Sequence, residues 1–134
     1  MSKIFITHCS NKKEPSLKGT NVLVTPDKLY KSSFLLGFID QCKLQNVKWA
    51  IFSDKYGIVL PNDKIAWYNK PPNTVTKDER DKLLADLLKK LGSFSEIYFY
   101  HNPGRFCSLY KRIIEEAKEK GMNIILFSHK YEIS

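Results

Sequence analysis

The sequence has little that would mark a metal protein or a disulfide-stabilised domain. Among its 134 residues there are 3 cysteines and 3 histidines. The cysteines, Cys9, Cys42 and Cys107, show neither the short spacing of zinc ligands nor an even number for disulfide pairing. We therefore expect no metal and no cofactor, and a protein of the reducing cytosol.

Long apolar runs, internal repeats and low-complexity segments are also missing. No stretch approaches the roughly 20 apolar residues that a membrane-spanning helix needs, and the first residues do not resemble a secretion signal. A chain of 134 residues has the usual size of one domain. These features predict a soluble, cytoplasmic protein with no membrane partner and a single domain over residues 1–134.

The chain does contain a regular alternation of apolar strands and amphipathic helices. Apolar residues at helical spacing follow Ser32 and Ser33, either of which is a plausible N-cap. A second set follows Thr76, which is expected to form a capping box with Glu79. A third helix is expected between Phe106 and Gly121. Four short apolar runs typical of buried strands lie over residues 3–7, 47–53, 96–100 and 123–128.

Such an alternation is typical of parallel sheets, because a helix carries the chain back between parallel strands. The predicted fold is therefore α/β: a three-layer α/β/α sandwich with a mostly parallel four-stranded sheet. Residues 14–24 and the aromatic-rich segment 61–76 are expected to be loops, since both contain several turn-forming residues.

Three polar clusters follow predicted strands and should meet at one edge of the sheet. They lie at residues 9–13, 53–57 and 101–105. Ligands of open α/β sheets bind beyond the carboxyl ends of the strands, so this edge is the predicted ligand site. For residues 53–57, where Gly57 permits a tight turn, a surface turn of solvated polar side chains is an equally good interpretation.

The third cluster turns through Pro103 and Gly104 into the predicted third helix. Backbone N–H groups at the start of a helix bind anions, and Arg105 would add a charged fork. This turn, with His101 beside it, is therefore the best candidate for a phosphate site, although one glycine falls short of a full phosphate-loop motif.

Aromatic side chains are expected to surround the same edge. Tyr30 and Tyr68 lie in loops near it, and either ring would stack on a flat ligand. The loop that carries Trp67 and Tyr68 is expected to form a wall or lid, or else to be held in place by its own aromatic side chains.

Candidates for catalysis are few, because no pair of carboxylates stands at a fixed spacing. A lysine that is desolvated beside another cation can become a nucleophile, so one of the adjacent residues Lys12 and Lys13 is a candidate. Two solvated loop lysines are the alternative. Cys9 is the second candidate, against the alternative of a buried, unreactive thiol, and Cys42 is expected to be a core residue.

The charge favours anionic partners. A net charge of +8 and a pI near 9.4 suit nucleotides or nucleic acids. Lysines scattered along a chain are also a common route to solubility. The charge therefore leaves both interpretations open.

Three linked motifs resemble an uncharacterised family of bacterial, archaeal and phage proteins, a domain of unknown function. They are Cys9-Ser-Asn-Lys-Lys13, Asp27-Lys-Leu-Tyr-Lys-Ser32 and Ile51-Phe-Ser-Asp-Lys-Tyr-Gly-Ile58, with Pro61 and Tyr68 behind. The first motif is also similar to the archaeosine synthase core domain, which acts on a 7-deazaguanine base in transfer RNA. The YaaA-like proteins, reported as DNA binders, are more distantly similar.

The resemblance implies a shared site made of Cys9, Lys13, Tyr30, Ser32, Ser53, Lys55, Tyr56 and Gly57. Two positions depart from the patterns. Asp54 stands where the uncharacterised family usually has Ala, and Glu14-Pro15 replaces the Pro-Tyr pair of the archaeosine pattern, which sets the chain apart from a lysine transfer of that type.

The sequence thus predicts a protein that binds a nucleobase, nucleoside or nucleotide, as an enzyme of nucleotide or modified-base metabolism. A basic module that binds DNA or RNA without catalysis is the alternative, and a purely protein-binding role is a third, so catalysis itself stays open. The catalytic candidates are Lys13 and Cys9. The predicted ligand-binding residues are Ser10, Tyr30, Ser32, Ser53, Lys55, Tyr56, Gly57, Tyr68, His101 and Arg105.

Overall fold

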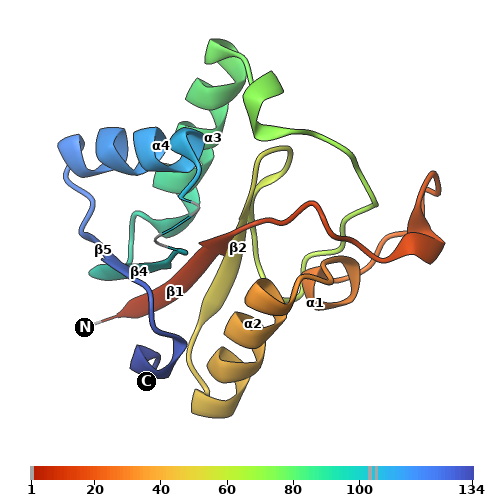
Figure 1. Cartoon of the computed structure of the whole chain (residues 1–134). Helices are drawn as coiled ribbons and strands as arrows, with labels where there is room; N and C mark the ends of the chain where they lie inside the picture. Colours follow the sequence, from red (N-terminus) through yellow and green to blue (C-terminus); the bar gives the residue numbers. More distant parts are fainter. Residues whose placement is uncertain (1, 103, 105) are drawn as a thin grey trace.

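A computed structural model describes residues 2–102, 104 and 106–134, which form one sheet flanked by helices (Figure 1). The strands are β1 (Lys3–His8), β2 (Trp49–Ser53), β3 (Gly57–Val59), β4 (Glu96–Tyr100) and β5 (Ile124–Phe127). The α-helices are α1 (Pro26–Leu29), α2 (Ser33–Gln45), α3 (Lys77–Leu91) and α4 (Ser108–Glu119). Short 3-10 helices lie at Pro15–Leu17, Pro72–Thr74 and Lys130–Glu132.

The sheet has five strands in the order β3-β2-β1-β4-β5. β1 pairs in parallel with β2 and β4, and β4 pairs in parallel with β5, whereas β3 is antiparallel to β2. The predicted α/β class is confirmed. The prediction of four strands was wrong, because the sheet has a fifth strand, β3. Since β3 is antiparallel to β2, the sheet is mixed. β3 is only 3 residues long, too short for an alternating pattern to indicate it.

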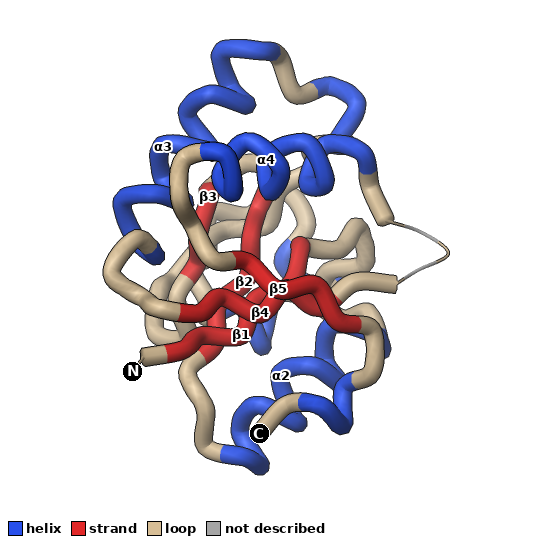
Figure 2. The backbone as a smooth tube through the Cα atoms, turned by 90° about the vertical axis from the view of Figure 1, so that its left-hand side faces the viewer, coloured by secondary structure: helices blue, strands red, loops and turns tan. Residues whose placement is uncertain are grey.

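Helices cover both faces of the sheet (Figure 2). α3 and α4 pack on one face, where Ile6 of β1 lies in the same buried cluster as Leu87 and Ile113. α2 packs on the other face, where Phe5 lies in a second buried cluster with Phe38. Neighbouring residues of β1 therefore serve opposite cores, as the period of two in a strand requires.

Two predicted helix starts are confirmed by their capping hydrogen bonds. The Ser32 Oγ accepts from the Leu35 N–H at 3.1 Å and so caps α2. At α3, the Thr76 Oγ1 accepts from the Glu79 N–H at 3.2 Å, and the Glu79 carboxylate accepts from the Thr76 N–H at 3.0 Å. Cys42 is buried in the core, as predicted, and burial raises the pKa of its thiol to about 12.

Other boundaries differ from the prediction. α4 begins at Ser108 rather than near Phe106, with Cys107 as its N-cap. The single turn of α1 was not predicted as a helix of its own, although Pro26 at its first position is a favourable start. In the described part of the chain, every helix is too short or too polar to span a bilayer.

Candidate functional site

The carboxyl ends of β1 and β2 bring two of the three polar clusters together. The Cys9 N–H donates to the Phe52 carbonyl at 2.9 Å, which extends the pairing of these strands by one residue beyond β1. Cys9 therefore lies beside the turn that follows β2. Four residues later, Lys13 forms an isolated antiparallel bridge with Tyr30.

Five side chains gather at this point, and we call them the inner cluster. They are Cys9, Lys13, Asp54, Tyr68 and Tyr110. The Cys9 Sγ lies 3.5 Å from the Asp54 Oδ1 and 3.1 Å from the Tyr110 Oη. The Lys13 Nζ lies 4.3 Å from the centroid of the Tyr68 ring, within the range of a cation–π contact.

Burial sets the ionisation of the inner cluster. Lys13 is 9% exposed and Asp54 is 3% exposed. Loss of hydration disfavours the charged form of each group, so it lowers the pKa of the Lys13 ammonium and raises the pKa of the Asp54 carboxyl and the Cys9 thiol. The opposite charges of Lys13 and Asp54 partly offset both shifts.

A chain of hydroxyl groups fixes the Tyr68 ring. Its Oη lies 2.7 Å from the Tyr30 Oη and 2.9 Å from the Ser53 Oγ. The Ser53 Oγ also accepts from the backbone N–H groups of Lys55 and Tyr56, at 3.1 and 3.0 Å. Because these two bonds occupy both lone pairs of the hydroxyl oxygen, the Ser53 hydrogen must point to Tyr68.

Gly57 closes the turn between β2 and β3. Its φ is +75°, a conformation that favours glycine. A Cβ at this position would also overlap the Asp86 carboxylate, which accepts from the Ile58 N–H at 2.7 Å. This turn directs Asp54 inward and leaves Lys55 exposed to solvent.

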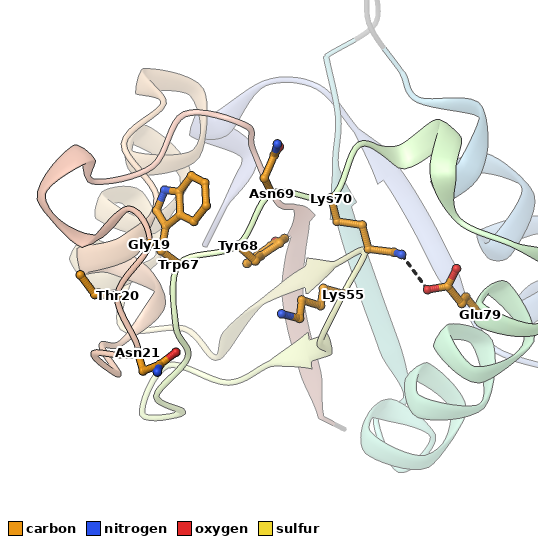
Figure 3. Close-up of a pocket in the computed structure, with 9 residues that line it drawn as sticks. All are labelled: Gly19, Thr20, Asn21, Lys55, Trp67, Tyr68, Asn69, Lys70 and Glu79. Atoms are coloured by element: carbon orange, nitrogen blue, oxygen red, sulfur yellow. Dashed lines mark ion pairs between the residues drawn. The ribbon is translucent and has the colours of Figure 1, made fainter.

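An open cleft of about 530 Å³ lies on the solvent side of Tyr68, and we call it the outer cleft (Figure 3). Figure 3 shows Lys55 and Tyr68 between the segment 19–21 and the ion pair of Lys70 with Glu79. In this ion pair, the Lys70 Nζ lies 2.6 Å from the Glu79 Oε2. The residues that line the outer cleft are Gly19, Thr20, Asn21, Lys55, Trp67, Tyr68, Asn69, Lys70 and Glu79.

A smaller hollow of about 320 Å³ adjoins the outer cleft and shares Lys55 and Glu79 with it. Asp54, Tyr56 and Gly57 line this hollow, so the turn that carries Asp54 borders open space. Both volumes fall within or near the range of small-molecule sites.

The predicted residues divide into two groups. The structure brings Cys9, Lys13, Tyr30, Ser53 and Tyr68 together, and it places Lys55, Tyr56 and Gly57 around the two hollows.

The others have different surroundings. The Ser10 hydroxyl donates to the Lys12 carbonyl at 3.1 Å, and Ser32 caps α2. The His101 ring stacks on Phe106 with centroids 4.8 Å apart, just past β4. Arg105 lies outside the described residues, as does Pro103 of the predicted phosphate turn.

Two residues of the inner cluster were missed. The sequence does not assign Asp54 to the site although it lies in the predicted turn, and Tyr110 lies within the predicted third helix with no role in the site. A phenol on an apolar helix face was the available signal, because a buried tyrosine hydroxyl needs a hydrogen-bond partner. Among the described residues, no three His, Cys, Asp or Glu side chains converge as metal ligands.

The fold and the site define an α/β protein with a buried lysine–thiol–carboxylate cluster behind an open cleft. The chain belongs to a family of unknown function, DUF6884, whose model matches residues 4–125. This match confirms the predicted membership of an uncharacterised family. Neither the curated proteins nor the solved structures include one that matches the chain. The similarity to the archaeosine synthase core domain and to YaaA-like proteins stays a prediction.

Proposed function

We propose that the outer cleft binds a nucleobase, nucleoside or nucleotide, and that the protein is an enzyme of nucleotide or modified-base metabolism. The observation that carries the proposal is the placement of Lys13. Its ammonium is nearly buried against Tyr68, and the same ring lines the cleft. Burying a charge is unfavourable, so a lysine in this position is more readily explained by function than by folding.

The lining of the outer cleft suits a flat ligand that carries an anionic group. Trp67 is half-buried in the wall and offers ring surface. Lys55 and Lys70 supply positive charge, and Asn21 and Asn69 supply amide donors and acceptors for a base. Rings, cations and amides together match the parts of a nucleotide.

Within this proposal the residues have distinct roles. Lys13 is the catalytic candidate, with Cys9 beside it, and Tyr68 is the surface against which the ligand lies. Tyr30 is fully buried and hydrogen-bonded to Tyr68, so it acts by orienting that ring rather than by stacking. His101 and Arg105 stay as predicted ligand contacts, with Arg105 expected to face an anionic group.

A thermal-shift screen tests the binding proposal. The panel comprises purine and pyrimidine bases, nucleosides and nucleotides, and 7-deazaguanine bases because of the first motif. A ligand at about a hundredfold excess over its dissociation constant stabilises by about 2.7 kcal/mol, which is expected to raise the melting temperature by roughly 5–10 °C. The absence of any shift across the panel would contradict the proposal.

Short DNA and RNA oligonucleotides belong in the same screen. Shifts that occur only with oligonucleotides and fade with added salt would support the basic nucleic-acid-binding module instead, because phosphate binding releases counterions.

Lys13 and its neighbour provide a matched pair of variants. Lys13→Ala is expected to lower ligand affinity at least about tenfold, the equivalent of 1.4 kcal/mol. Lys12→Ala removes the same charge from an exposed position and is expected to leave affinity unchanged at moderate salt. Equal affinities in the two variants would remove Lys13 from the site.

A further inference from the structure

Asp54 and Cys9 form the closest contact between an acid and a thiol in the described part of the chain. Their Sγ and Oδ1 lie 3.5 Å apart. The two residues come from different strand ends, and the short turn closed by Gly57 holds Asp54 in place. The contact therefore follows from the backbone and does not depend on a flexible side chain alone.

The direction of the two hydrogen bonds at the Cys9 sulfur follows from which of the groups carry a proton. An ionised carboxylate only accepts, so the Cys9 S–H donates to Asp54. The sulfur is then free to accept from the Tyr110 hydroxyl, whose oxygen lies 3.1 Å away. Tyr110 is buried on α4, so the thiol contacts both a proton acceptor and a proton donor.

We propose that Asp54 is the proton acceptor of Cys9, and that the two side chains hold one proton between them in neutral solution. In the transfer, the S–H bond breaks, an O–H bond forms at the Asp54 Oδ1, and the electron pair stays on sulfur. The thiolate then faces the Lys13 ammonium and accepts from Tyr110. Asp54 is thereby a further catalytic residue, and Tyr110 is a positioning residue.

The charges around the pair agree with this assignment. Lys13 and Lys70 attract the Asp54 carboxylate. An ionised Asp54 in turn disfavours ionisation of Cys9, because two negative charges would then lie side by side. The Tyr110 hydroxyl donates toward the sulfur. A pair of interacting groups loses its two protons in two steps that belong to the pair, so only one negative charge is present over the neutral range.

Nuclear magnetic resonance of protein labelled with ¹³C at the cysteine Cβ measures this directly, because the shift reports thiol ionisation even without solvent access. With 3 cysteines, Cys42 and Cys107 serve as internal references, and a Cys9→Ser sample assigns the spectrum. In Asp54→Asn, the midpoint of Cys9 is expected to fall by about one pH unit or more, because the neighbouring negative charge is gone. Lys13→Met is expected to raise the Cys9 midpoint, because the neighbouring positive charge is gone.

Asp40→Asn is the matched control, since Asp40 is exposed on α2, and it is expected to leave the Cys9 midpoint in place. An unchanged Cys42 resonance shows that a variant is folded. If Asp54→Asn does not fold, Asp54→Ala takes its place. A Cys9 midpoint that is the same with and without the carboxylate would overturn the proposal.

A catalytic use of the Cys9 thiolate rests on the proposed function. The proton-sharing pair and the proposed ligand can nevertheless fail separately. A shifted midpoint without nucleotide binding in the thermal-shift screen would keep the proton-sharing pair and remove the proposed ligand. Nucleotide binding with an unshifted midpoint would keep the ligand and remove the pair.

Discussion

Two lysines approach the same tyrosine ring in opposite surroundings. The Nζ of Lys13 lies 4.3 Å from the Tyr68 centroid, and that of Lys55 lies 5.8 Å from it. Lys13 is buried in the inner cluster, whereas Lys55 is exposed in the outer cleft. The same residue type therefore has a fixed position in the protein interior and an adaptable one at the surface.

Within the proposed function, this difference gives the two regions different tasks. The inner cluster is held by hydrogen bonds among side chains from distant segments, which keeps its groups at set distances. The outer cleft is lined mostly by loop residues, of which Asn21, Lys55 and Asn69 are exposed to water, and exposed loop side chains are more mobile than buried ones. Substitutions that compare matched residues of the two regions test whether they differ as described.

The largest difference is expected between Tyr68 and Trp67. Tyr68→Ala removes a buried ring and the hydroxyl that joins Ser53 and Tyr30, so it should lower the free energy of unfolding by about 3–5 kcal/mol. Trp67→Ala, in the half-buried cleft wall, should cost about 1 kcal/mol. Urea unfolding measures both, and equal losses would contradict the distinction between the two regions.

Gly57 and Gly19 give the second comparison, because both have a φ of +75°. Gly57→Ala is expected to cost about 2–3 kcal/mol, since its Cβ would also overlap the Asp86 carboxylate. No atom lies within 4 Å of a Cβ at Gly19, so Gly19→Ala is expected to cost only the backbone strain of about 1 kcal/mol. The same urea series measures these values, and a costlier change at Gly19 would count against the described turn.

The third comparison is between Lys13 and Lys55. Burial lowers the pKa of Lys13, so the folded chain binds its proton less tightly than the unfolded chain does. Lys13→Met should therefore raise the free energy of unfolding at neutral pH, by less than about 1 kcal/mol because water screens part of the site. Lys55→Met should leave it within about 0.5 kcal/mol.

The pH dependence of stability checks the sign of this effect. Wild type should gain stability as the pH rises from the lowered pKa of Lys13 in the folded chain toward its ordinary value of 10.5, and Lys13→Met should lack this gain. A large loss of stability in Lys13→Met at neutral pH would show that the lysine supports the fold.

The smallest effect is expected at Glu79, on the rim of the cleft. The hydrogen bond from Lys70, helped by the Thr76 N–H, holds its pKa at about 2. Glu79 should therefore stabilise the fold above about pH 4.5, the ordinary value, and this contribution should be lost as the pH falls toward 2. Melting temperatures of wild type and Glu79→Gln should converge over that interval, with Asp78→Asn, exposed beside it, as the control.

Much of the fold could be predicted because its signals are local. Thr76 and Glu79 are three residues apart, and the run of apolar residues that ends at Ser53 is a buried strand by its composition alone. Parallel strands bring their carboxyl ends to one edge, so the meeting of Cys9 with the segment after Ser53 also followed from the sequence.

The remainder depends on packing between distant segments. Tyr110 reaches Cys9 from α4, 101 residues away, and no local pattern states where its hydroxyl points. Tyr30 was expected over the ligand but is buried, because the bridge between Lys13 and Tyr30 fixes it behind Tyr68. β3 depends on the turn at Gly57, whose direction is set by contact with Asp86.

The most direct test of the account is a titration of ¹⁵N-labelled protein with the four common purine and pyrimidine nucleoside monophosphates. We expect the amide resonances of residues 19–21, Lys55 and 67–70 to shift together on binding. The same resonances should stay in place at equal concentrations in Lys13→Met. The result that would contradict it is an absence of shifts at millimolar ligand, or shifts confined to the separate hollow lined by Phe34, Tyr100 and His129.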